Sequence, residues 1–502
     1  MSLKVYNTLT KQKEDFIPIE DGKVRMYVCG MTVYSDAHIG HARTYYAFDV
    51  IRRYLEYKGY KVTYVQNVTD VDDKIIAAAN KQGMDPLEYS KIYLERCLGD
   101  LDALGIRRAD IYPKASEEIP AMIEMIQKII ENGYGYEANG DVYFSVEKFK
   151  DYGKLSGQNI EELTAGARIE PGEKKRNPLD FALWKHMKPG EPFWDSPWGP
   201  GRPGWHIECS AMSSKYLGLP FDIHGGGMDL RFPHHENEIA QAEAATGKPF
   251  VKYWLHCGLL TVDGEKMSKS LGNIINIRDI LKTWDPEVIR FFFAQTHYRR
   301  PPDFNETALK NAEKGLTRIY RLKDRLHDIS KDVEDYSIDE STLSENDKQY
   351  YSAIENFKTK FEEAMDDDFN TPEAVAVLFE FINQSNKYLE LEENPNKKLC
   401  RYAYETLLEL GRIITLFQED KKEEREEEVI NSLRDIINRY QPELLIEKDD
   451  ISAMMKQILE IREEARRQRD WNKADSIRDE LTKIGFEIQD TADGPVWRRR
   501  II

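Results

Sequence analysis

The segment FPHHENEIAQ, residues 232–241, places histidines and glutamates where they could hold a metal ion. We expect this segment to be helical, and residues four apart on a helix share one face. His234 and Glu238 therefore project together, whereas His235 points elsewhere. The HExxH motif of metalloproteases is absent, because Ile239 stands where its second histidine is required.

Two cysteines elsewhere in the chain could complete a metal site with this pair. Cys29 ends an apolar segment, and Cys209 lies in WHIECS, just ahead of FDIHGGGMDL. An imidazole nitrogen, a carboxylate oxygen and two thiolates form a set that suits zinc. The spacing alone leaves two ordinary alternatives open. Free cysteines are often small buried hydrophobes, and a helical His–Glu pair often lies on the surface.

The motif HIGH at residues 38–41 could bind phosphate. It follows an apolar segment and opens a predicted helix, whose N-terminus offers unpaired N–H groups and the positive end of the helix dipole. Gly40 would let a ligand approach the backbone, and His38 and His41 can donate hydrogen bonds to phosphate oxygens. Taken alone, these four letters also fit a histidine pair with no catalytic role.

The motif KMSKS at residues 266–270 follows a turn predicted at Asp263–Gly264. Lys266 and Lys269, on a mobile loop, could neutralise the charge that develops on a pyrophosphate leaving group. Two lysines at this spacing more often belong to a solvated surface. The motif gains weight because it follows HIGH in the chain.

The elements that must position these motifs read as strand, helix, strand. Residues 25–29 and 61–68 are predicted buried parallel strands, and 42–59 is a predicted helix with Gly59 suited to its C-terminal cap. This unit is Rossmann-like, although the GxGxxG signature of dinucleotide-binding proteins is absent.

The predicted fold class is an α/β Rossmann-like catalytic domain with an inserted connective domain, followed by an all-α helical bundle and a small mixed α/β C-terminal domain. We place the two catalytic halves at residues 1–110 and 201–304, the insertion at 111–200, the bundle at 305–420, and the linker and C-terminal domain at 421–502. Within the bundle we expect a helix with Thr371 as its N-cap, and residues 451–485 read as a single further helix.

The 502 residues are too many for one core, which agrees with several domains. No signal peptide or membrane span is expected, and five cysteines in so long a chain favour a reducing compartment, hence the cytoplasm. The net charge of −18 points away from nucleic acid, although an acidic protein can carry a local basic face.

Together HIGH and KMSKS resemble the signature of class I aminoacyl-tRNA synthetases. The segments CGMTVY, NVTDVDDKI, GWHIECSAMS, DIHGGGMDLRFPHHENEIAQ and DFNTPEA resemble the cysteinyl-tRNA synthetase family over most of the chain. The resemblance implies that L-cysteine is activated by ATP to cysteinyl-adenylate and transferred to the 3′-terminal adenosine of tRNA(Cys). It further implies tRNA contacts in the bundle and an anticodon-binding C-terminal domain.

The resemblance also implies one Zn2+ per subunit, and Mg2+ bound with ATP. The family's zinc ligands match Cys29, Cys209, His234 and Glu238. Zinc binds the softer thiolate in preference to a hydroxyl, so it would accept cysteine and reject serine. One departure is Met31, where family members often have proline, but Met31 is not a ligand.

Other roles are carried over by position. The expected catalytic residues are His38, His41, Lys266 and Lys269, and the expected ATP contacts are His38, Gly40, His41, Gly225, Gly226 and Lys269. The expected contacts with substrate cysteine are Thr69, Trp205, His224 and Asp229, with His224 turned towards the adenylate. Each of the last three also has an ordinary reading, as a packing tryptophan, a turn histidine and a loop-capping aspartate.

The C-terminal part combines basic and aromatic residues. Arg466, Arg467 and Arg469 lie near Trp471, a combination that suits phosphate contact and stacking on unpaired bases. Two alternatives stay open: a cysteine ligase that acts on an amino sugar, and an inactive RNA-binding paralogue. We expect a monomer without a membrane partner.

Overall fold

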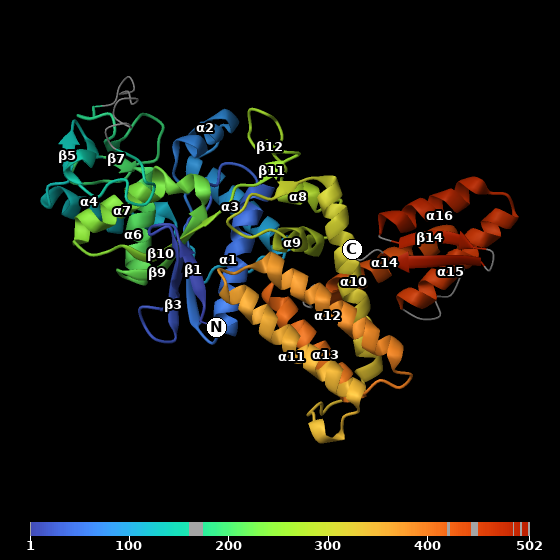
Figure 1. Cartoon of the computed structure of the whole chain (residues 1–502). Helices are drawn as coiled ribbons and strands as arrows, with labels where there is room; N and C mark the ends of the chain where they lie inside the picture. The colour runs from blue at the N-terminus through green and yellow to red at the C-terminus, as the bar shows by residue number, and fades with distance from the viewer. Residues whose placement is uncertain are drawn as a thin grey trace. The chain divides into compact units, whose positions relative to one another are not determined.

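The structure is a computed structural model, and it describes residues 2–159, 174–418, 422–442, 450–484, 486–491 and 494–499. The chain forms two compact units, Met1–Thr415 and Leu416–Ile502 (Figure 1). None of the helices in the described ranges combines the length and apolar composition that a membrane crossing requires.

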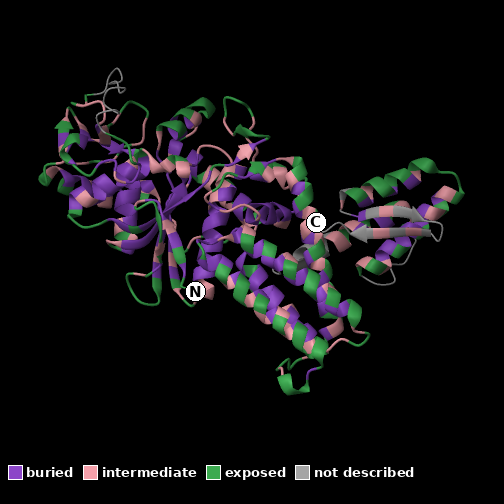
Figure 2. Ribbon diagram, in the orientation of Figure 1, coloured by how far each residue is buried: buried purple, intermediate pink, exposed green. Residues whose placement is uncertain are grey.

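The first unit is built around a four-stranded parallel sheet with the order β10-β9-β3-β4. Its strands are β3 (Lys23–Val28), β4 (Lys61–Gln66), β9 (Phe221–Gly227) and β10 (Val251–Cys257). All seven residues of β9 are buried, and Figure 2 shows the same dense burial across the sheet and its flanking helices. The strands predicted at 25–29 and 61–68 are confirmed as parallel neighbours. The two halves of the fold meet between β3 and β9.

Helix α1 (Ile39–Tyr57) connects β3 to β4, and its N-cap is His38. It begins three residues before the predicted helix does. At its C-terminal end Gly59 has a φ of 90°, and its N–H donates to the carbonyl of Glu56. The left-handed backbone at Gly59 explains why glycine suits this position.

Between β4 and β9 the chain forms an inserted part with its own sheet. It contains α4 and an antiparallel sheet with the order β5-β6-β7-β8, and its core packs on helices α6 and α7. The bounds are α4 (Ile119–Glu131), β5 (Gly135–Ala138), β6 (Asp141–Phe144), β7 (Phe181–His186), β8 (Gly201–Pro203), α6 (Trp205–Leu217) and α7 (His234–Thr246).

Further elements complete the catalytic part of this unit. They are β1 (Lys4–Asn7), β2 (Gln12–Asp15), α2 (Asp73–Gln82), α3 (Pro86–Ala103), the 3-10 segment η3 (Met228–Arg231), β11 (Thr261–Val262), β12 (Glu265–Lys266), α8 (Ile277–Ile280), α9 (Pro286–Ala294) and β13 (Asp303–Phe304).

The helical part of the first unit consists of α10 (Glu306–Ser330), α11 (Glu345–Asp366), α12 (Thr371–Leu391) and α13 (Lys397–Ile413) (Figure 1). The predicted N-cap of α12 is wrong by one residue. Asn370 is the cap, since its side chain accepts from the N–H of Glu373. Thr371 is the first helical residue.

The second unit contains α14 (Lys422–Tyr440), α15 (Ile451–Arg467), α16 (Trp471–Lys483) and the antiparallel hairpin of β14 (Phe486–Thr491) and β15 (Gly494–Arg499). The prediction of one helix over 451–485 is wrong. Arg469 has a φ of 63°, and Asp470 begins a new helix by accepting from the N–H of Lys473. The mixed α/β character of this unit agrees with the predicted fold class.

Candidate metal centre and nucleotide site

Side chains that could bind ligands gather at the carboxyl ends of the four parallel strands. Cys29 follows β3, Thr69 lies three residues beyond β4, and His224 lies within β9. His256 is the penultimate residue of β10. Open α/β sheets bind ligands at this edge, where the strand order reverses.

One cluster contains all four side chains that the sequence singles out as metal ligands, Cys29, Cys209, His234 and Glu238. Their ligand atoms lie within 4.8 Å of one another, and all four residues are buried. The two sulfurs are 3.8 Å apart. Glu238 Oε1 lies 3.0 Å from His234 Nε2 and 3.5 Å from Cys29 Sγ. The cluster can hold a metal ion.

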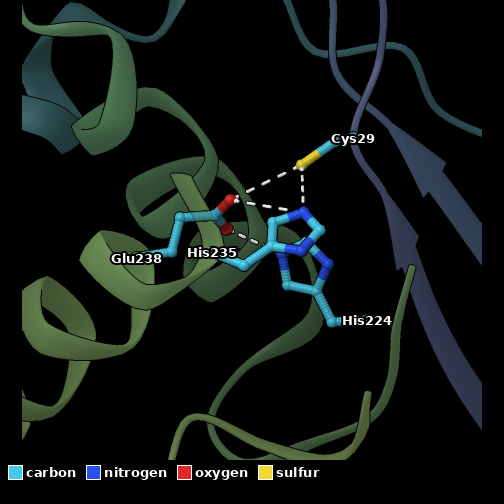
Figure 3. A group of neighbouring side chains, drawn as sticks. All are labelled: Cys29, His224, His235 and Glu238. Carbon is cyan, nitrogen blue, oxygen red and sulfur yellow. Dashed lines mark hydrogen bonds and ion pairs between the residues drawn. The ribbon is translucent and has the colours of Figure 1, made fainter. Parts of the chain in front are cut away.

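A second possible ligand set shares Cys29 and Glu238 and adds His224 and His235 (Figure 3). His235 Nε2 lies 3.3 Å from Cys29 Sγ. His224 Nε2 lies 2.6 Å from Glu238 Oε2, which is a hydrogen-bond length. Because this set offers one sulfur rather than two, the first set is the softer site. His224 is better placed to orient Glu238 than to bind the metal itself.

Other histidines contact the ring nitrogens of His234 and His235 that face away from the cluster. His206 Nδ1 lies 2.8 Å from His234 Nδ1, which leaves His234 Nε2 facing the cluster. His235 Nδ1 lies 2.8 Å from His256 Nε2, and His256 in turn contacts the hydroxyl of Thr8 at 2.9 Å. Contacts of this kind fix the orientation of an imidazole ring.

Without a metal ion, the buried cluster holds protons that metal binding would displace. Burial raises the pKa of Cys29. Burial acts in the same direction at Cys209, but the contacts with Cys29 and His234 outweigh it and lower the pKa of Cys209 to about 6. Burial would lower the pKa of His234, but Glu238 and Cys209 raise it to about 10. A metal ion needs thiolate and neutral imidazole, so its binding would release protons here.

Three other residues expected to contact the substrate differ in their surroundings. Trp205 begins α6, is 38% exposed, and stacks on the ring of His234 with centroids 4.1 Å apart. The buried hydroxyl of Thr69 donates to Glu208 Oε2 at 2.9 Å, and burial raises the pKa of Glu208. Asp229 is exposed on η3.

The glycines of β9 are required by packing. A Cβ atom on Gly225 would lie 2.2 Å from the ring of Phe48 on α1, and one on Gly226 would lie 2.9 Å from the ring of His235. Helix α1 therefore packs directly on the backbone of β9. Packing alone thus accounts for these glycines, and their contact with ATP stays a prediction.

The structure brings HIGH and KMSKS together. The N–H of Ile39 donates to the carbonyl of Ile275, just beyond the KMSKS loop, at 2.9 Å. A Cβ atom on Gly40 would lie 2.8 Å from Cε of Met267, the second residue of KMSKS. Any larger residue at position 40 would press against this loop.

The two signature lysines differ in their surroundings. Lys269 Nζ lies 4.0 Å from the ring centroid of Tyr34, a cation–π contact. Lys266 ends the two-residue strand β12 and is exposed. Neither lysine forms an ion pair within the described part of the chain, so both charges are available to a ligand.

His38 and His41 form a compact pair at the start of α1. Their rings are stacked with centroids 3.6 Å apart, and each accepts from the backbone N–H of the other at 3.3 Å. Burial, assisted by the charge of Lys269, lowers the pKa of His38 to about 4. Both rings are thus neutral near pH 7, and their Nε2 atoms can donate to a phosphate.

In the second unit, two of the three singled-out arginines have partners on their own helix. Arg466 pairs with Glu463 at 2.8 Å and Arg467 with Glu464 at 3.2 Å. Arg467 and Trp497 also line a groove of about 830 Å³ between α15 and β15.

Sequence reasoning missed His206, His256, Asn67 and Glu208 as neighbours of the site. His206 and Glu208 lie within the segment quoted for Cys209, and His256 is the penultimate residue of a buried strand. A search for polar residues at predicted strand ends would have found His256 and Asn67.

Comparison with protein families matches three parts of the chain. Residues 15–314 match a family described as tRNA synthetases class I (C) catalytic domain. Residues 360–418 match the DALR domain, and residues 448–498 match the Cysteinyl-tRNA ligase anticodon binding domain.

Similar curated proteins cover the whole chain. The cysteine–tRNA ligases of Thermococcus onnurineus and Pyrococcus horikoshii are 50% and 51% identical over 499 residues, which is 99% of this chain and 99% of each relative. That of Anoxybacillus flavithermus is 49% identical over 503 residues, 99% of this chain and 100% of the relative.

Solved structures are similar in fold at low sequence identity. Methionyl-tRNA synthetase of Mycobacterium tuberculosis with methionyl-adenylate has a TM-score of 0.59 at 15% identity and covers 87% of this chain and 93% of its own. LeuRS of Agrobacterium radiobacter K84, in a ternary complex, has a TM-score of 0.60 at 12% identity, covering 80% and 85%.

Proposed function

The chain belongs to the cysteine–tRNA ligase family, and we propose that it activates L-cysteine with ATP and transfers it to tRNA(Cys). The observation that carries this proposal is the buried cluster of Cys29, Cys209, His234 and Glu238, in the same compact unit as the adjoining HIGH and KMSKS motifs. One part of the site suits a thiol substrate, and the other suits a nucleoside triphosphate.

The metal is proposed to be Zn2+. Bonds of about 2.3 Å to sulfur and about 2.0 Å to nitrogen or oxygen imply tetrahedral edges of roughly 3.3 to 3.8 Å. The 3.8 Å and 3.5 Å separations from Cys29 Sγ to Cys209 Sγ and Glu238 Oε1 suit these edges, and the 3.0 Å from His234 to Glu238 is slightly shorter. When bound, zinc would supply a soft Lewis acid that prefers a thiolate to a hydroxyl.

HIGH and KMSKS are proposed to act on ATP, which enters with Mg2+. The cysteine carboxylate attacks the α-phosphate, and pyrophosphate leaves. His38 and His41 would donate to phosphate oxygens as neutral imidazoles. Lys266 and Lys269 would balance the charge on the departing pyrophosphate, and Gly40, Gly225 and Gly226 would let the nucleotide approach the backbone.

Trp205, Thr69 and Asp229 are proposed to bind the substrate cysteine. Trp205 would cover the side chain, since it stacks on His234 at the cluster. Asp229 is exposed and carries a carboxylate that could pair with the α-ammonium group. For His224, the 2.6 Å contact with Glu238 favours a role in orienting that carboxylate over the expected contact with the adenylate.

The second unit is proposed to bind the anticodon of tRNA(Cys), and the helices of residues 305–420 to contact the tRNA. The match of residues 448–498 to an anticodon binding domain supports this role and disfavours a ligase for amino sugars. We further propose that the protein acts in the cytoplasm as a monomer, with catalytic halves at 1–110 and 201–304 and a connective insertion at 111–200.

ATP–pyrophosphate exchange tests the first step. Exchange should depend on L-cysteine and exceed that with L-serine by about 10⁴-fold in kcat/KM. Charging of tRNA(Cys) against an aminoglycoside acceptor tests the second step. Exchange without tRNA charging would point to another acceptor, and no exchange with the metal bound would indicate an inactive RNA-binding paralogue.

A further inference from the structure

Three tyrosine rings surround a hollow at the end of the helical part of the first unit, which we call the tyrosine hollow. Tyr336 lies on the loop between α10 and α11, Tyr351 on α11 and Tyr402 on α13. The other lining residues all belong to that loop and are Glu334, Asp335, Ser337 and Ile338. The hollow has a volume of about 350 Å³, and small-molecule sites usually have about 300 to 1,000 Å³. Its loop lies at the tip of these helices (Figure 1), on elements that carry none of the proposed catalytic residues.

The rings form one aromatic wall with Tyr402 in the middle. The ring centroid of Tyr402 lies 6.3 Å from that of Tyr336 and 5.9 Å from that of Tyr351. The Tyr402 hydroxyl donates to a carboxylate oxygen of Glu355 on α11, which fixes the ring between the two helices. The face of an aromatic ring is the negative end of its quadrupole, so a wall of such faces attracts cations.

The loop that carries Tyr336 is held in place by its own polar contacts. Asp335 Oδ1 accepts from the N–H of Ser337 at 3.0 Å and from its hydroxyl at 2.5 Å. Asp335 Oδ2 pairs with the ammonium group of Lys398 on α13 at 3.2 Å. The loop ends where Ser344 caps α11 by accepting from the N–H of Asp347. Tyr336 is therefore presented to the other two rings by a segment tied to both helices.

The charges that act on the wall are negative. Burial raises the pKa of Tyr402, and the contact with Glu355 raises it further. At Tyr351, burial and the charges of Glu355 and Glu340 raise the pKa of the phenol. Both rings are therefore neutral near pH 7. In the described part of the chain, no lysine or arginine lies over any of the three rings, and Glu334 forms no ion pair.

The composition of the loop separates cationic ligands from nucleic acid. Aromatic faces alone would also suit a nucleobase. Residues 331–345, however, include six carboxylates and one lysine: Asp332, Glu334, Asp335, Asp339, Glu340, Glu345 and Lys331. Such an acidic rim repels phosphate groups and raises the local concentration of cations. The hollow thus combines aromatic faces, an unpaired carboxylate and a field that favours positive charge.

We propose that the tyrosine hollow binds an organic cation, whose ammonium or guanidinium group lies over the tyrosine rings and pairs with Glu334. Two sources carry this chemistry: a free polyamine, and a lysine or arginine side chain of a protein partner. The site goes beyond the proposed ligase function, since neither the amino acid nor ATP is required for it.

Calorimetric titration of the full chain tests the binding. Spermidine represents a free polyamine, and the peptide acetyl-glycyl-arginyl-glycine amide represents a basic side chain. The titrations are made at about 0.15 M salt, which screens the general attraction between a cation and an acidic protein. At least one probe should bind, and the tighter one identifies the source. The uncharged chain 1,8-octanediol should not bind.

Variants at exposed positions separate the ring from the charge. Tyr336→Ala should weaken binding of the tighter probe by about two- to fivefold, the contribution of one exposed cation–π contact. Tyr336→Phe keeps the ring and should bind like the wild type. Glu334→Gln should weaken binding by up to about fivefold, and combining it with Tyr336→Ala by about tenfold. Because both side chains are exposed, the melting temperature should not change.

Asp332→Asn is the matched control, because Asp332 is an exposed carboxylate of the same loop that does not line the hollow. Its binding of either probe should equal that of the wild type. The inference is overturned if neither probe binds, or if 1,8-octanediol binds as tightly as spermidine. It is also overturned if Asp332→Asn weakens binding as much as Glu334→Gln, or if Tyr336→Phe weakens it as much as Tyr336→Ala.

Discussion

Glu238 and Lys269 both belong to the proposed active site, and the structure holds them very differently. Glu238 is fully buried, with one carboxylate oxygen facing His234 and Cys29 and the other contacting His224. Lys269 lies on a loop of mostly exposed and half-buried residues, and its ammonium group rests on the ring of Tyr34. The metal cluster is therefore fixed by buried side-chain contacts, whereas the KMSKS lysines lie on an open loop with few contacts.

This difference suits the two tasks. Selection between a thiol and a hydroxyl needs ligand atoms at fixed separations, which interlocked buried side chains supply. Closing over a triphosphate needs groups that can move with it, which a loop with few contacts permits. If the cluster and the loop are independent, a change in one should leave the other intact.

The largest effect is expected for Cys209→Ser. The variant should lose the metal, and its cysteine activation should fall by more than the roughly 100-fold that loss of an outer contact costs. Metal content and ATP–pyrophosphate exchange, measured on the same preparation, check this. Full metal occupancy in the variant would remove Cys209 from the site.

Lys269→Ala should lower kcat by roughly 10²- to 10³-fold, because charge stabilisation of the leaving group is lost. Metal content should stay at the wild-type level if the loop and the cluster are independent. Lys266→Ala is the companion variant, and we expect a smaller loss. A fall in metal content in either variant would show that the loop and the metal cluster are not independent.

His206→Asn should weaken metal affinity by about 10- to 100-fold, since His206 orients the His234 ring from behind. Competition with a chelator measures this affinity. The KM for ATP should not change, and a large rise would mean that the cluster and the nucleotide site are coupled.

The smallest effect concerns pH, because the pKa of His38 is lowered mainly by burial and only secondarily by Lys269. Between pH 6.5 and about 4 the unfolded chain binds a proton at His38 that the folded chain does not. Stability conferred by neutral His38 is therefore complete above pH 6.5 and declines as the pH falls. In Lys269→Ala the pKa of His38 should rise, and the decline in melting temperature should become shallower. An unchanged slope would place Lys269 away from HIGH.

Much of the fold could be predicted because its signals are local. The apolar segments at 25–29 and 61–68, with a helical pattern between them, predict two parallel strands joined by a helix. This prediction needs no information about the rest of the chain. The spacing of four between His234 and Glu238 likewise predicts a shared helix face. Cys29 and Cys209 suit zinc by residue type, but only the resemblance to a family decided for them over the ordinary alternatives, because their proximity depends on how the two halves of the sheet meet.

Features that depend on contacts between distant segments escaped prediction. His206 and His256 are side chains of ordinary appearance in the sequence, and their positions behind His234 and His235 follow from how α6, α7 and β10 pack.

The break at Arg469 depends on a left-handed backbone conformation that non-glycine residues rarely adopt. The helical pattern runs across it without interruption.

Helix α7 is buried at every position from His234 to Ala242. Its first turn sends side chains in several directions at once: Glu236 accepts from the backbone N–H groups of Leu155 and Ser156 in the insertion, and Asn237 accepts from Tyr152. No position on this turn can be redesigned without disturbing a second part of the protein. An engineer who wishes to alter the amino acid that the enzyme accepts should therefore begin from Trp205, whose side chain is partly exposed at the cluster.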